Sequence, residues 1–274
     1  MPAPIAASKV SASPLGARLR YWRVQRRLSQ LELALLSGVS ARHLSCAETG
    51  RARPSREVVH ALAAALDLPL RERNALLVAA GFAPAFQETA LGSCEFAPMR
   101  QAIDLTLNGH DPFPAFAFDG GWNVLQVNRA MVQVFGQVRP GGPKHANVVR
   151  QVLDRDDMRP YIENWAEVAW NLLAHVEQAA LSRPSDAALQ SLLAAARTTD
   201  GLPPRPTQHA APPRSPVMVA IFRAGDRRLR FFSTLTRFMA AADVGLEEVG
   251  VECLHPVDDE TRCFCRELWD APGE

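Results

Sequence analysis

The segment spanning residues 28–50 constrains the fold more than any other part of this sequence. It reads LSQLELALLSGVSARHLSCAETG, in which Ser29 and Ser40 are placed to cap two short helices. Gly38 lies between them, where a turn needs a residue that tolerates a left-handed backbone, and Ala34 is small enough for two helices to cross closely. Apolar residues from both helices are available to fix the crossing angle, namely Leu33, Val39 and Leu44. The segment predicts two helices that meet at a tight turn.

Helical periodicity continues on both sides of this segment. Leu15, Leu19 and Trp22 fall at spacings i, i+4 and i+7 and define one apolar helix face. A fourth helix is expected after Pro54–Ser55, and a fifth from Pro69 to a stop at Gly81. The sequence therefore predicts an all-α domain of five short helices over residues 15–84.

Charge is unevenly distributed along the chain. Residues 1–86 contain twelve Lys/Arg and five Asp/Glu, a net charge of +7, whereas the remainder contains 18 basic and 24 acidic residues, a net charge of −6. A basic first part joined to an acidic remainder suggests a polyanionic partner for the first part alone. Chance clustering of charge on a solvated face is the alternative.

Beyond residue 84 the pattern changes to short strands mixed with helices. We expect strands at residues 115–118, 122–127, 217–222, 229–235 and 248–255, and helices at residues 128–135, 161–181, 186–197 and 258–268. This order predicts an α+β domain with an antiparallel sheet covered by helices on one side.

The predicted domain organisation follows from these patterns. Residues 1–14 are expected to be a flexible tail, residues 15–84 the helical domain, residues 85–96 a linker and residues 97–274 the α+β domain. Residues 200–216 contain six prolines and are expected to form an extended loop.

The composition and the motifs limit the cellular compartment and the kinds of chemistry that we expect for this protein. No apolar run is long enough to cross a membrane, the N-terminus does not resemble a signal peptide, and five irregularly spaced cysteines suggest reduced thiols, so we expect a cytoplasmic protein. No phosphate-binding glycine loop or Ser/His/Asp set is evident, and we expect no catalytic residues and no cofactor.

A zinc site is the one metal site worth weighing. Cys253 and His255 share a strand face, but Cys263 and Cys265 would lie about 200° apart on a helix and would not complete a tetrahedral site. We therefore predict no metal.

The helical segment resembles the Cro/repressor (XRE) type of helix-turn-helix. The stretches at 38–57 and 69–84 are similar to the MmyB-like group of bacterial regulators, and so are stretches of the second domain at 118–124, 128–130, 229–234 and 242–261. The resemblance implies a DNA-binding transcription regulator whose PAS-like second domain binds a small apolar or fatty-acid-like ligand. The proline-rich residues 200–216 depart from the pattern.

The resemblance assigns roles in DNA binding to the two central helices. Ser29, Gln30 and Ser40 are expected at phosphates, and Arg42 is the candidate for a bidentate contact to guanine. The other candidates are Ala41, Ser45 and Cys46 at the groove floor, and His43 and Arg51 at the backbone. Arg23 and Glu48 are expected to form a structural ion pair between the first and third helices.

Aromatic residues are candidates for a ligand pocket in the second domain, although filling the core is the alternative for each of them. The pocket residues predicted are Phe118, Trp122, Asn128, Phe135, Tyr161, Trp165, Phe222 and Phe232. Asn128, Arg129 or Arg159 is the candidate polar anchor.

Three partners are predicted: double-stranded DNA, a small hydrophobic ligand and a second copy of the chain in a homodimer. The alternative functions are a protein-interaction adaptor whose helix-turn-helix does not bind DNA, and a small-molecule enzyme fused to a DNA anchor.

Overall fold

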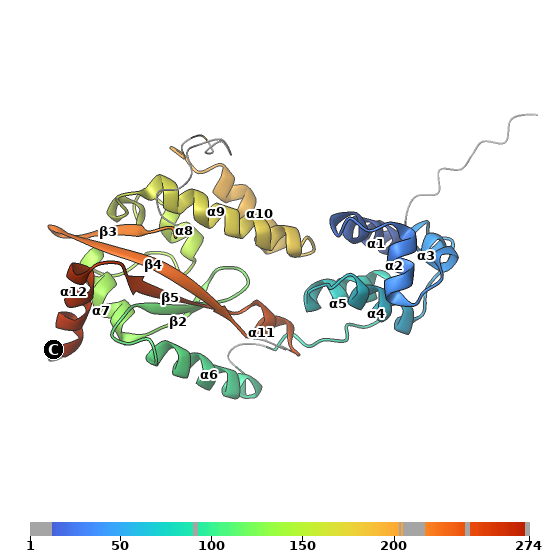
Figure 1. The fold of residues 1–274 in the computed structure, drawn as a ribbon, viewed down its shortest axis with the longest axis horizontal. Coiled ribbons are helices and arrows are strands. Elements are labelled where there is room, and N and C mark those ends of the chain that lie inside the picture. The colour runs from blue at the N-terminus through green and yellow to red at the C-terminus, as the bar shows by residue number, and fades with distance from the viewer. Residues whose placement is uncertain (1–12, 90–92, 203, 205–216, 239–241, 272–274) are drawn as a thin grey trace, which may run out of the picture. The chain divides into compact units, whose positions relative to one another are not determined.

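The computed structural model describes residues 13–89, 93–202, 204, 217–238 and 242–271. The chain divides into two compact units, residues 1–87 and 88–274, each with its own hydrophobic core (Figure 1). The first twelve residues of the predicted tail and most of the predicted proline-rich loop lie outside the described residues.

The first unit consists of five short helices. They are α1 (Pro14–Gln25), α2 (Gln30–Ser37), α3 (Ala41–Glu48), α4 (Arg56–Ala65) and α5 (Leu70–Ala79). Serine side chains cap the first four helices by accepting hydrogen bonds from backbone N–H groups of the first turn, which would otherwise lack partners. The all-α class expected from the sequence is confirmed.

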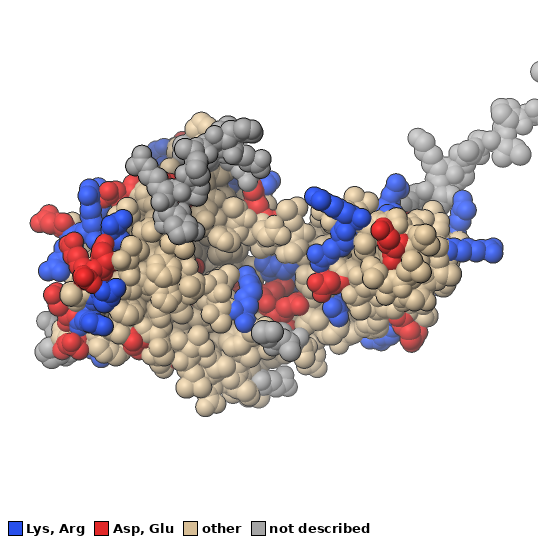
Figure 2. Space-filling view, in the orientation of Figure 1, with Lys and Arg blue, Asp and Glu red and all other residues tan. Residues whose placement is uncertain are grey.

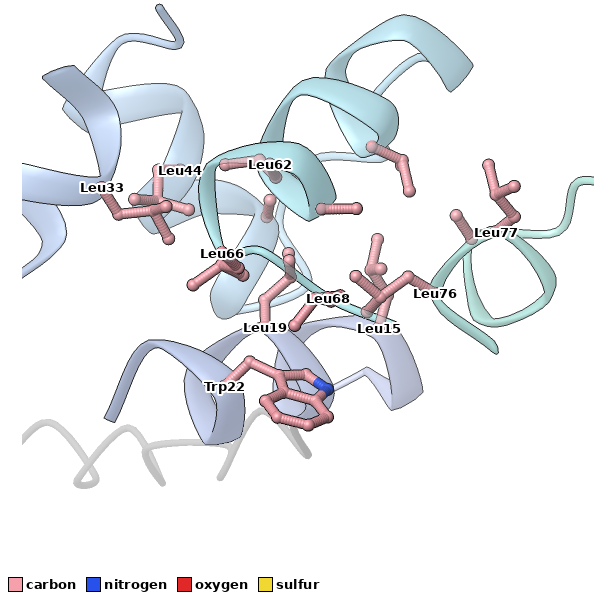
Figure 3. Close-up of a cluster of buried hydrophobic side chains, with 14 of the residues drawn as sticks. Leu15, Leu19, Trp22, Leu33, Leu44, Leu62, Leu66, Leu68, Leu76 and Leu77 are labelled. Carbon is pink, nitrogen blue, oxygen red and sulfur yellow. The ribbon is translucent and has the colours of Figure 1, made fainter. Parts of the chain in front are cut away.

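Leucines supply most of the core of the first unit (Figure 3). Leu19 and Trp22 of α1 pack in the same cluster as Leu33 of α2 and Leu44 of α3. Gly16 marks where α1 crosses α3, because a Cβ at this position would lie 2.3 Å from the carbonyl oxygen of Glu48. Helix α3 thus packs against both α1 and α2.

The second unit is built around a five-stranded antiparallel sheet with the strand order β2-β1-β5-β4-β3. The strands are β1 (Ala115–Phe118), β2 (Val124–Val127), β3 (Ala220–Ala224), β4 (Arg227–Arg237) and β5 (Gly250–Pro256). The first and last strands in sequence, β1 and β5, are therefore neighbours near the centre of the sheet. The predicted α+β class is confirmed.

Helices cover both faces of this sheet, whereas the sequence led us to expect helices on one side. The α-helices are α6 (Ala97–Asn108), α7 (Arg129–Val138), α8 (Val148–Leu153), α9 (Trp165–Ser182), α10 (Ala187–Arg197), α11 (Val244–Glu248) and α12 (Asp259–Asp270). Ile103 and Leu107 of α6 pack with Ala117 of β1 and Val251 of β5. The alternate residues of the same strands, Phe116 and Leu254 among them, face α7, α8 and α9.

Several predicted elements begin later than expected. Strand β2 starts at Val124 and not at residue 122, and β5 starts at Gly250 and not at residue 248. Helix α9 starts at Trp165 and not at Tyr161, because residues 159–161 form a 3₁₀ turn and Ile162 pairs with Phe222 in an isolated bridge. Strand β3 starts at Ala220 and not at residue 217. Before α9, the connecting segment pairs with β3 and does not extend the helix.

Candidate DNA-binding surface and ligand cavity

Helices α2 and α3 form a helix-turn-helix. Ser29 accepts a hydrogen bond from the backbone N–H of Glu32, and the Glu32 carboxylate accepts one from the N–H of Ser29, which completes a capping box. Gly38 has a φ of 68°, in the left-handed region, and joins the two helices. Ser40 then caps α3 by accepting from the N–H of His43. Local sequence therefore fixes where both helices begin.

An ion pair joins α1 to α3, where the sequence placed it. Arg23 Nε donates to Glu48 Oε1 at 2.6 Å and Arg23 Nη2 donates to Glu48 Oε2 at 3.0 Å, in the two-pronged geometry that favours arginine. Glu48 is only 6% exposed, and the hydrogen bond that Arg23 donates to its carboxylate raises the pKa of Arg23. The pair holds the end of α3 against α1.

The predicted DNA-contacting residues lie at the start of α2, on α3 and just after α3. Four of them are exposed, namely Ser29, Ser40, Arg42 and Arg51. Ala41, at the predicted groove floor, is half-buried. The other half-buried residues of this group are Gln30, His43, Ser45 and Cys46. Arg42 is therefore a long, exposed cation on the helix that a major groove would receive.

Two of these residues have neighbours that bear on their predicted roles. Gln30 donates from Nε2 to Glu48 Oε2 at 2.8 Å, so its side chain is already engaged in the α1–α3 ion pair. The Nε2 atom of His43 is buried and has no hydrogen-bond partner among the described residues. This burial argues against a contact between His43 Nε2 and a phosphate.

The surface charge of each unit can be followed in Figure 2. On the face drawn there, arginine side chains project from the first unit, with fewer acidic side chains among them. On the second unit, blue and red side chains are interspersed near α12, and most of the remaining visible face is tan.

The second unit contains a cavity of about 1010 Å³ between the sheet and its helices. All five strands contribute to the lining, as do helices α7, α8 and α9. Six aromatic rings line it: Phe116, Phe118, Trp122, Phe135, Phe222 and Phe231. A volume of this size and an aromatic lining are typical of sites for small organic ligands.

Four of the eight predicted pocket residues line this cavity. They are Phe118, Trp122, Phe135 and Phe222. The rings of Phe118 and Trp122 stack with centroids 4.9 Å apart, and those of Phe135 and Phe222 meet edge to face at 5.0 Å. Trp122 adopts a φ of 67°, which is unusual for a bulky residue. Asp119 stabilises this turn because its carboxylate accepts from the N–H groups of Gly121 and Asn123.

Asn128 lies outside the cavity lining and has a structural role as the N-cap of α7. It is 2% exposed and caps α7 by accepting from the N–H of Met131. The same side chain accepts from the N–H of Ala115 and donates to the carbonyl of Phe113. These bonds consume its polar atoms, so Asn128 is not available as a polar anchor for a ligand.

The other three predicted pocket residues also lie outside the cavity lining. Phe232 points to the opposite face of β4, as strand alternation requires, and stacks on His255. Trp165 donates from its indole to the carbonyl of Val152, with Arg159 over its ring. Tyr161 packs at the edge of the core, and the remaining anchor candidate, Arg129, lies over Trp269.

The polar groups that do line the cavity are residues the sequence reasoning missed. They are His145, Gln151, Asn171, His175, Ser233 and Glu252. Burial raises the pKa of the Glu252 carboxyl, and a hydrogen bond from Ser233 opposes this rise. Glu252 could have been noticed in the sequence, because it is an acidic residue within the otherwise apolar strand pattern of residues 249–254. No helix within the described ranges is long and apolar enough for a bilayer crossing.

Comparison with known families agrees with this architecture. Residues 14–76 match the family model of a helix-turn-helix domain, and residues 99–268 match that of the MmyB-like transcription regulator ligand binding domain. No curated protein matches the chain. Since the second match alone covers more than half of the chain, the protein belongs to the MmyB-like transcription regulators.

Proposed function

We propose that the protein binds specific DNA sequences through α3 and that a small apolar molecule in the cavity of the second unit controls this binding. The observation that supports the first part is the capped α2–Gly38–α3 geometry with Arg42 exposed on α3. Arginine can donate two hydrogen bonds to O6 and N7 of guanine, and this pairing distinguishes guanine from the other bases.

We infer that the DNA-binding domain spans residues 15–84, that residues 85–96 connect it, and that the ligand-binding domain spans residues 97–274. The ligand is proposed to be apolar or amphipathic, with fatty-acid-like molecules as one class to test. Neither domain is proposed to carry out catalysis.

We further propose that the protein acts as a homodimer. A dimer presents two copies of α3 to half-sites about 34 Å apart, one turn of B-DNA, and both affinity and specificity increase when both half-sites are bound. Light scattering in solution, together with the symmetry of the selected DNA sequence, tests this proposal.

DNA binding itself is tested by selecting bound fragments from the genomic DNA that surrounds the gene. We expect a preferred sequence that survives excess competitor DNA, with affinity that falls as salt rises, by a log–log slope of about −0.9 per neutralised phosphate. Binding without sequence preference, or without salt dependence, would favour the adaptor function instead.

A further inference from the structure

The carboxyl group of Glu252 lies on the sheet side of the cavity. Glu252 is in the central strand β5, and its cross-strand neighbours are Phe116 of β1 and Leu235 of β4, both of which also line the cavity. The next cavity-facing residue of β5 is Leu254. A carboxyl group is therefore set into an otherwise apolar row of side chains.

No arginine or lysine lines the cavity among the described residues. The hydroxyl of Ser233 hydrogen-bonds to Glu252, and His145 is already engaged with Asp154 at 2.7 Å. His175, the other titratable lining residue, hydrogen-bonds through Nδ1 to the carbonyl of Asn171 within α9. Among the described lining residues, no arginine or lysine would balance the charge of Glu252 when it is ionised.

The surroundings of Glu252 favour one sign of ligand charge. Aromatic rings carry partial negative charge on their faces and attract cations, most strongly where water is excluded. Six such rings line the cavity. A ligand carboxylate near Glu252 would meet a second carboxyl and electron-rich rings, whereas an ammonium group would gain from both.

We propose that the cavity selects an apolar amine, whose ammonium group pairs with Glu252 while its hydrocarbon part contacts the aromatic rings. The proposal rests on the proposed function, since it specifies the ligand that the second unit senses. An amine that arrives protonated displaces the carboxyl proton to solvent, and one that arrives as the free base accepts that proton. Either route yields the same ammonium–carboxylate pair.

Three probes of equal chain length and different head group test this proposal. Decylamine, decan-1-ol and decanoic acid are titrated into the full-length protein by calorimetry at pH 7. We expect decylamine to bind at least about tenfold more tightly than decanoic acid, because only the acid leaves two carboxyl groups together without a counter-charge. Decanol, which is neutral, is expected to fall between them. This comparison on the natural protein needs no variant.

A charge-removing variant then assigns the preference to Glu252. In Glu252→Gln the preference for decylamine over decanoic acid should disappear, whereas Glu260→Gln, at an exposed position on α12, should retain it. Thermal unfolding of both variants confirms that they are folded.

Three outcomes overturn the inference. They are tighter binding of decanoic acid to the natural protein, a preference that survives in Glu252→Gln, and no binding of any of the three probes. Each leaves the proposed DNA binding standing, because the selection of genomic fragments without any probe tests that function separately.

Discussion

At the scale of single residues, Arg42 and Glu252 are the residues most important to the proposed binding of DNA and of ligand. Arg42 is exposed at the start of α3, and Glu252 faces a cavity with no cationic side chain among its described lining residues. Both are ionisable residues whose described surroundings leave room for an external partner. Their roles can therefore be tested by removing the charge and following binding.

Arg42→Ala should weaken binding to the preferred DNA sequence by about 1–3 kcal/mol, which is the discrimination expected from a bidentate contact to guanine. Binding to unrelated DNA should change much less, because we propose that other residues make the phosphate contacts. Fluorescence anisotropy with specific and random duplexes measures both affinities, and Arg20→Ala on α1 is the control. An equal loss on all sequences would make Arg42 a backbone contact.

Glu252→Gln should also change how stability depends on pH. The unfolded chain releases this proton near pH 4.5, whereas burial raises the pKa in the folded protein, so folding becomes less favourable as pH rises above 4.5. The glutamine variant lacks this cost. Its melting temperature relative to the natural protein should therefore be higher at pH 8 than at pH 4. A difference that is constant across this range would contradict the raised pKa.

At the scale of elements, the Arg23–Glu48 pair decides how firmly α3 is held. Arg23→Ala leaves a carboxylate that is 6% exposed without its main partner, and such losses cost about 3 kcal/mol or more. Urea unfolding should show this loss, and replacing both residues by methionine should recover part of it. Full stability of the single variant would show that Gln30 alone satisfies Glu48.

Some elements were predictable from sequence because their signals are local. Ser29, Ser40 and Ser55 each cap a helix at the predicted place, since capping depends on hydrogen bonds within one turn. Helix α6 was not predicted, although Pro98 in its first turn and the Ile103–Leu107 spacing are recognisable signals. Its buried face consists of Ile103 and Leu107, which pack with residues of β1 and β5 that are distant in sequence.

The cavity lining could be predicted only in part, because some of its residues are far apart in the sequence. Phe118 and Trp122 belong to one hairpin and were found together, whereas Glu252 is brought beside Phe116 by strand pairing across more than 130 residues. Strand alternation further decides which aromatic residues face inward, and it removes Phe232 from the cavity. Register of this kind depends on the whole sheet.

At the scale of the whole molecule, ligand control requires that the ligand favour one arrangement of the protein over another. Gly136 in α7 lines the cavity, and a Cβ added there meets no atom within 4 Å. Gly136→Leu should occupy ligand space and abolish the effect of the bound molecule on DNA affinity. Gly136→Ala, which adds one methyl group, is the control and should respond to ligand.

Ligand-free DNA affinity should be the same in both glycine variants and in the natural protein, as measured by anisotropy with the preferred duplex. A ligand response that persists in Gly136→Leu would show that control does not act through this cavity.

Hydrogen bonds hold the chain on both sides of the connection between the two units. Asn74 of α5 binds the backbone of Ala85 and Phe86, and Asp243, the cap of α11, binds both the N–H and the hydroxyl of Thr89. Only two residues separate these anchored points, and an extended chain spans about 3.5 Å per residue. Each of these segments is held by its own unit, so the connection between the two units is limited to Gln87 and Glu88.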